Sequence, residues 1–203
     1  MTLSGRRSGA QAEIRRARGH RGSPWLGRCG DGVGGHEVVD RRRIELIEPG
    51  LSAAPLHYES ARLDVAATAA LVAEVRASVA RAAAAAFDEL PGPVRSISLR
   101  AWPLDFPDDI AVQRRAPYEA RADGVMYRQE LFELAHARGW EVHLYDAKTV
   151  VGQAAGMLAE RADEVLEGPR ATLGPPWTKD HRVALAATVV AGAGQRRPPN
   201  SQS

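Results

Sequence analysis

Residues 139–146, GWEVHLYD, decide the fold, because a glycine that suits the end of a helix is followed directly by an alternating strand pattern. Residues 94–99, VRSISL, repeat that alternation, and the segment between the two runs reads as a helix from about Ala122 to Arg138. A strand, a helix and a second strand in this order pair their strands in parallel. This stretch therefore predicts an α/β domain.

The predicted elements on either side of this unit extend the same layered plan. A strand from His36 to Glu48 and a short strand over Leu56–Tyr58 predict a hairpin. Apolar residues spaced by three and four predict helices over Arg62–Leu90 and about Lys148–Glu167. A last helix, over about residues 179–191, is apolar nearly all round and is expected to be buried. The predicted fold class is α/β, with a mixed sheet, antiparallel at the hairpin and parallel beyond it, and with helices on both faces.

Composition divides the chain into one domain and two tails. Residues 1–35 hold nine Gly and seven Arg against two acidic residues, which predicts a disordered basic tail. The alternative is a basic arm that follows a phosphate backbone. Residues 36–194 are predicted to form a single α/β domain, and residues 195–203 a disordered polar tail. Because the whole chain carries a net charge of +2, the part outside the basic tail is mildly acidic.

Several classes of protein are excluded by residue content. Cys29 is the single cysteine, which excludes an internal disulfide and a Cys-rich zinc site. The longest apolar run, Val183–Ala193, is too short to span a bilayer, and the Arg-rich N-terminus lacks the apolar stretch of a secretory signal. We therefore expect a cytoplasmic protein with no membrane partner. The pattern does not predict the oligomeric state.

Residues 139–150, GWEVHLYDAKTV, and residues 179–186, KDHRVALA, carry a resemblance to a known family. The segment from Ser96 to Val190 resembles the C-terminal half of RNase H-like domains, most closely the RuvC-type resolvase branch. The family opens with a strand bearing an Asp, and no such strand can be read in residues 1–35. The resemblance thus implies an RNase H-like domain whose first strand is missing, and which is either a nuclease or a relative that has lost catalysis.

The activity that the resemblance implies is cleavage of a phosphodiester by two Mg²⁺ or Mn²⁺ ions, in branched or structured nucleic acid. Asp180 matches the carboxylate at the start of the family's final helix. Asp105, Asp108 and Glu119 follow the strand over residues 96–102 and are the other candidates for catalysis and for holding the metal. The alternative is that Asp180 serves only the N-terminus of its helix, and that the others are solvated loop charges.

Other catalytic patterns are weaker. Pro107-Asp108 and Asp146-Ala147-Lys148 are similar to the PD-(D/E)xK nuclease motif, but that motif lies on a hairpin and here a helix separates its halves. The histidines show no zinc-ligand spacing. Trp102, Trp140 and Trp177 are predicted to anchor the core at the ends of elements, with base stacking as the alternative.

The second function class is a non-enzymatic one. A scaffold or partner-binding α/β domain would keep the same fold and use its loops for contacts. The two classes differ in one structural feature, because a nuclease must gather its carboxylates around shared metals and a scaffold need not.

Overall fold

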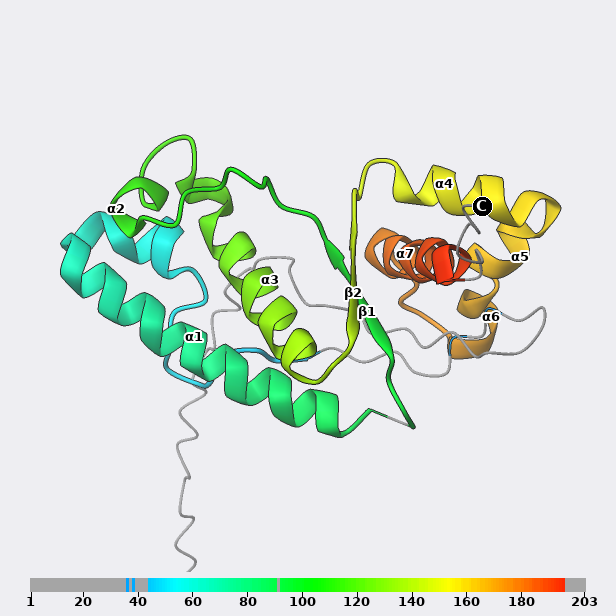
Figure 1. The fold of residues 1–203 in the computed structure, drawn as a ribbon, viewed down its shortest axis with the longest axis horizontal. Helices are drawn as coiled ribbons and strands as arrows, with labels where there is room; N and C mark the ends of the chain where they lie inside the picture. The colour runs from blue at the N-terminus through cyan, green and yellow to red at the C-terminus, as the bar shows by residue number, and fades with distance from the viewer. Residues whose placement is uncertain (1–35, 37, 39–43, 91, 196–203) are drawn as a thin grey trace, which may run out of the picture.

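The computed structural model describes residues 36, 38, 44–90 and 92–195, and it has a two-stranded parallel sheet among predominantly helical elements (Figure 1). The chain forms a mixed α/β structure. Its elements in order are η1 (Pro55–Glu59), η2 (Ser60–Arg62), α1 (Val65–Asp88), β1 (Ser96–Arg100), α2 (Ile110–Gln113), α3 (Glu119–Ala137), β2 (Glu141–Tyr145), α4 (Val150–Leu158), η3 (Ala159–Arg161), α5 (Ala162–Glu167), α6 (Pro169–Leu173) and α7 (Lys179–Gln195).

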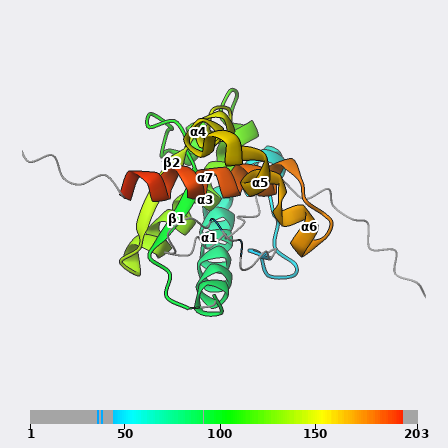
Figure 2. The ribbon, with the colours of Figure 1, turned by 90° about the vertical axis from the view of Figure 1, so that its right-hand side faces the viewer.

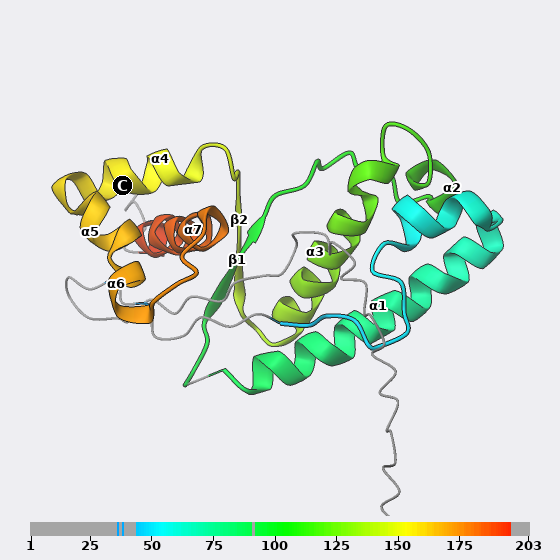
Figure 3. The same ribbon diagram turned by 180° about the vertical axis from the view of Figure 1, so that it is seen from behind.

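The two strands pair in parallel, as the strand–helix–strand pattern predicts. Their register runs from Ser96 opposite Glu141 to Arg100 opposite Tyr145. Seen from the front and from behind, α1 and α3 lie on one side of the strands and α4 to α7 on the other (Figures 1 and 3). The expectation of helices on both faces is therefore confirmed.

The first core fills the space between α1, α3 and one face of the sheet. Helix α1 begins because the Asp64 carboxylate accepts a hydrogen bond from the backbone of Ala67, at 2.7 Å. Its apolar stripe then packs on α3 and on η1. This core consists chiefly of the following buried residues: Leu56, Val72, Val75, Val79, Ala83, Phe87, Ile97, Leu99, Val125, Met126, Leu131 and Ala135.

The second core joins α4, α5 and α7 on the other face of the sheet. Helix α7 has no exposed residue from His181 to Val189, which confirms its predicted burial. Figure 2 looks onto this side and shows α7 lying across the strands. His181 fixes the start of α7, because its Nδ1 atom accepts the backbone N–H of Thr178 at 2.9 Å.

The predicted hairpin is wrong in the part that the structure describes. Residues 44–48 form no strand, and Leu56–Tyr58 lie in the π-helical turn η1. The reason is tertiary, since the buried Asp123 carboxylate on α3 accepts the backbone N–H groups of Leu56 and His57 at 2.8 and 3.0 Å. The sheet described here is consequently parallel rather than mixed. Residues 37 and 39–43 of the predicted strand, and the two predicted tails apart from Gln195, lie outside the described residues.

The prediction of one continuous helix over Lys148–Glu167 is also wrong. The structure divides it into α4, η3 and α5, and Ala159 at the break has a φ of 50°. The break turns Val165 and Leu166 of α5 back onto the core of α4 and α7. Burial of these side chains outweighs a local backbone strain of about 1–3 kcal/mol.

Candidate functional site

The carboxyl ends of β1 and β2 bring two polar side chains together. Arg100 and Tyr145 are register partners at the last position of their strands, so their side chains leave the sheet on the same face. Arg100 is exposed, whereas Tyr145 is half-buried and packs on the second core. In open α/β sheets, ligands bind outside the carboxyl ends of the strands.

Arg128 of α3 is near enough to these two residues for their charges to act on its pKa, and we call Arg100, Arg128 and Tyr145 the arginine site. Burial lowers the pKa of the Arg128 guanidinium most, the positive charge of Arg100 lowers it further, and Tyr145 acts in the opposite direction. The guanidinium lies beside Gly124, one helical turn earlier, with Nη1 3.7 Å from where a Cβ at that position would lie. The positive charges of Arg100 and Arg128 therefore repel each other.

Neither of these cations is neutralised within the described part of the chain. The Nε atom of Arg128 is shielded from solvent and has no hydrogen-bond partner there, and neither Arg100 nor Arg128 has an ion pair. By contrast, Arg81 on α1 makes two hydrogen bonds to Glu48, at 2.8 and 2.9 Å. Partial burial of a guanidinium has a desolvation cost, which a bound anion would offset.

Tyr145 adds a hydroxyl group to the site. Burial raises its pKa most, the charges of Arg100 and Arg128 lower it, and Asp180 raises it. The net direction is upward, so the hydroxyl keeps its proton at neutral pH and can donate a hydrogen bond. Two guanidinium groups and one hydroxyl donor are a suitable donor set for a phosphate.

The carboxylates predicted from the sequence are placed as follows. Asp180 lies exposed in the first turn of α7, close enough to Tyr145 to affect its pKa. Asp105 and Asp108 are exposed in the loop between β1 and α2, and Glu119 is the half-buried first residue of α3. Across the described ranges, no three His, Cys, Asp or Glu side chains are grouped so that they could hold a metal ion. These four carboxylates are therefore not brought together as a metal site.

Asp146 and the three tryptophans, which the sequence analysis considered for nuclease chemistry and base stacking, have structural roles. The Asp146 carboxylate accepts the backbone N–H of Lys148 at 2.9 Å and so forms the turn before α4. Trp177 donates from Nε1 to the carbonyl of Leu166 at 3.0 Å. Trp102, Trp140 and Trp177 all pack on one of the two cores, as predicted for anchors.

Sequence reasoning missed Arg100 and Arg128. Arginine outnumbers lysine by 25 to 2 in this chain, which lowers the weight of any one arginine. A signal for Arg100 was present, because it directly follows a predicted strand whose partner ends in Tyr145. Arg128 had no such signal, since it is singled out by an Nε without a hydrogen-bond partner among the described residues, which the sequence cannot show.

Comparisons with protein-family models, with curated proteins and with solved structures each found no match. In the described portion, no helix has both the length and the apolar character needed to cross a membrane. The functional interpretation of the arginine site therefore depends on its own geometry and charge.

Proposed function

We propose that this protein is a binding domain that holds a phosphate group of its partner between Arg100 and Arg128, at the carboxyl edge of the parallel sheet. The observation that carries the proposal is the state of Arg128. Its side chain is half-buried, its Nε is shielded from solvent without a partner among the described residues, and the positive charge of Arg100 acts on it. A bound phosphate would neutralise both charges and accept their N–H groups.

The donor set favours phosphate over a carboxylate. A phosphate monoester carries up to two negative charges and three free oxygens, which two guanidinium forks and one hydroxyl can share. A single carboxylate has two oxygens and one charge, so it would leave one arginine uncompensated. The proposed ligand class is therefore a phosphorylated molecule, bound without a chemical step.

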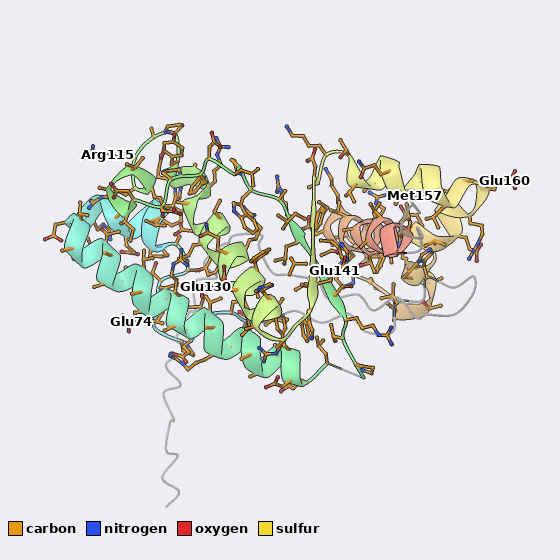
Figure 4. All side chains as sticks on the ribbon, viewed as in Figure 1. Glu74, Arg115, Glu130, Glu141, Met157 and Glu160 are labelled. Carbon is orange, nitrogen blue, oxygen red and sulfur yellow. The ribbon has the colours of Figure 1, made fainter. Side chains whose placement is uncertain are left out.

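The test is calorimetric titration of the full chain with inorganic phosphate and pyrophosphate at low ionic strength. Arg128→Gln should weaken binding by roughly 10- to 100-fold, since hydrogen bonds to charged groups contribute about 1.5–3 kcal/mol. Arg128→Lys keeps the charge but loses the fork, so it should bind with intermediate affinity. Arg115→Gln is the matched control, because Arg115 is exposed beside α2, away from the strands (Figure 4). Equal losses in Arg128→Gln and Arg115→Gln would contradict the proposal.

The RNase H-like nuclease is the second candidate, and one observation favours it. Asp180 lies near Tyr145 at the carboxyl edge of the sheet, where the resemblance expects a metal-binding carboxylate. A nuclease predicts that Mn²⁺ raises the unfolding temperature of the wild type, that Asp180→Asn removes this shift, and that branched DNA is cleaved. A binding domain predicts no cleavage, and phosphate affinity that is independent of Mn²⁺.

A further inference from the structure

An open groove lies between the end of α3 and the start of β2, at the opposite end of β2 from Tyr145. It is lined by Phe132, His136, Gly139, Trp140, Glu141 and Val142. Its aromatic rings are already ordered against one another. Phe132 and His136 are parallel, with centroids 6.3 Å apart, and Trp102 meets Phe132 edge-on at 6.0 Å. We call this surface the α3–β2 groove.

The groove is continuous with the arginine site along α3. Arg128, Phe132 and His136 follow one another at four-residue intervals, so they form one stripe of about 12 Å on the helix surface. Strand β2 runs beside this stripe and packs on α3. Val142 and Leu144 share one face of β2, and Leu144 is 43% exposed, so this face of the strand is apolar and partly accessible.

The chemistry changes along this surface. The Arg128 end has a cation with no ion pair among the described residues, the middle has aromatic and apolar side chains, and the far end has the exposed carboxylate of Glu141. A ligand that fits must therefore carry an anion next to a flat ring system. Glu141 would repel a second anion at its end of the groove, but it can accept the N–H groups of a base.

We propose that the α3–β2 groove binds single-stranded nucleic acid, with a base against Phe132, His136 and Trp140 and a backbone phosphate on Arg128. The inference rests on the proposed phosphate-binding function and names its partner. An aromatic platform beside a cationic groove is the arrangement by which proteins hold single strands with little sequence preference. A duplex fits poorly, because its bases are stacked inside and cannot reach the rings.

The openness of the groove selects a polymer over a free nucleotide. Small-molecule ligands are held in concave pockets that bury most of their surface, whereas this groove lies open on one side of the molecule. A strand gains affinity from successive phosphates and bases along its length, so it does not need an enclosed pocket.

The experiment measures binding of the full chain to a fluorescein-labelled 12-nucleotide poly-dT by anisotropy, in 50 mM and 200 mM salt. The wild type should bind, and His136→Ala and Phe132→Leu should each weaken binding about tenfold through lost stacking. Arg128→Gln should weaken binding and reduce the salt dependence by about one phosphate contact. The two ring variants should leave the salt dependence unchanged, which a general loss of folding would not do.

Two controls separate this inference from the proposed function. His136 is exposed, so His136→Ala keeps the test valid if Phe132→Leu fails to fold. Tryptophan fluorescence should be quenched by the oligonucleotide in the wild type, and Trp140→Phe should lose most of that quenching. Suppose that phosphate binding needs Arg128, but the oligonucleotide does not quench tryptophan fluorescence and the ring variants have no effect. That result would overturn the groove inference and leave the proposed function intact. Tighter binding of a phosphopeptide than of the oligonucleotide would also overturn it, and loss of all Arg128 dependence would overturn both.

Discussion

Replacing Arg128 with Met should make the free protein more stable while abolishing phosphate binding. Met keeps an unbranched stem of similar volume, so the packing of the Arg128 methylenes is largely retained. The substitution breaks no ion pair among the described residues, and it removes both the burial of a cation and its repulsion by Arg100. Since the group is half-exposed and partly screened, we expect a gain of about 1 kcal/mol. For a protein of this size the unfolding temperature should rise by about 2–4 °C.

The assay is thermal unfolding by circular dichroism, with and without phosphate. Phosphate at 100 times its Kd should stabilise the wild type by about 2.7 kcal/mol and leave Arg128→Met unchanged, so the order of stability should reverse. High salt screens the repulsion and should reduce the advantage of the variant in the free state.

Arg76→Met provides the matched control. Arg76 is ion-paired with Glu130 and donates to Gln129 at 3.1 Å, so its loss should destabilise the protein by about 1 kcal/mol. A destabilised Arg128→Met, together with an undiminished response to phosphate, would refute the reasoning, because it would make Arg128 a structural residue.

Three further predictions concern stability. Ala159→Gly relieves the positive φ of 50° and should stabilise the fold by about 1 kcal/mol, which urea unfolding would measure; a loss of stability would contradict the strain. Asp123→Asn leaves one of two backbone N–H groups of η1 without its acceptor and should cost about 2–4 kcal/mol in the same assay, whereas an unchanged midpoint would exclude this role. Burial raises the pKa of Tyr127, so stability should hold below pH 10 and fall above it, as the unfolded state alone loses its proton; a fall of the same size in Tyr127→Phe would assign it to other groups.

Local patterns predicted those elements whose packing follows from their own sequence. The three-and-four spacing in residues 65–88 places Val72, Val75 and Val79 on one face, and that face is buried in the structure. The two alternating strands and the buried final helix were predictable for the same reason. What failed depends on distant partners. Leu56 forms part of a helical turn because of a carboxylate 67 residues away, and no local pattern contains that contact.

The site was less predictable than the fold, because the feature that marks Arg128 is a missing hydrogen-bond partner, and a sequence does not show which side chains have partners. The sequence drew attention to carboxylates, because they can bind metal ions. In the structure, several carboxylates instead accept hydrogen bonds from nearby backbone groups. Asp109 caps α2 and Asp146 forms the turn before α4. Arg128 has no signature of this kind. That its Nε has no partner among the described residues can be seen only in the folded structure, in which α3 packs on both strands.

Gly124 places no side chain against the Arg128 guanidinium, and it allows the proposal to be tested without altering either arginine. A glutamate at position 124 would stand four residues before Arg128, the spacing at which Glu and Arg pair on a helix. The nearest atom to a Cβ there is Nη1 of Arg128, 3.7 Å away, so a Cβ meets no clash and starts next to the guanidinium. Gly124→Glu should stabilise the protein by about 1 kcal/mol, from helix propensity and the new pair.

The same substitution should abolish phosphate binding, because the new carboxylate would form an ion pair with the Arg128 guanidinium, which would then no longer be available to the phosphate. Gly124→Ala is the control, since it supplies most of the gain in helix propensity, about 0.5–1 kcal/mol, and leaves Arg128 unpaired. Phosphate affinity should therefore survive in Gly124→Ala and disappear in Gly124→Glu, although both variants are more stable than the wild type. If the two variants bound phosphate equally well, Arg128 would not be the group that holds it.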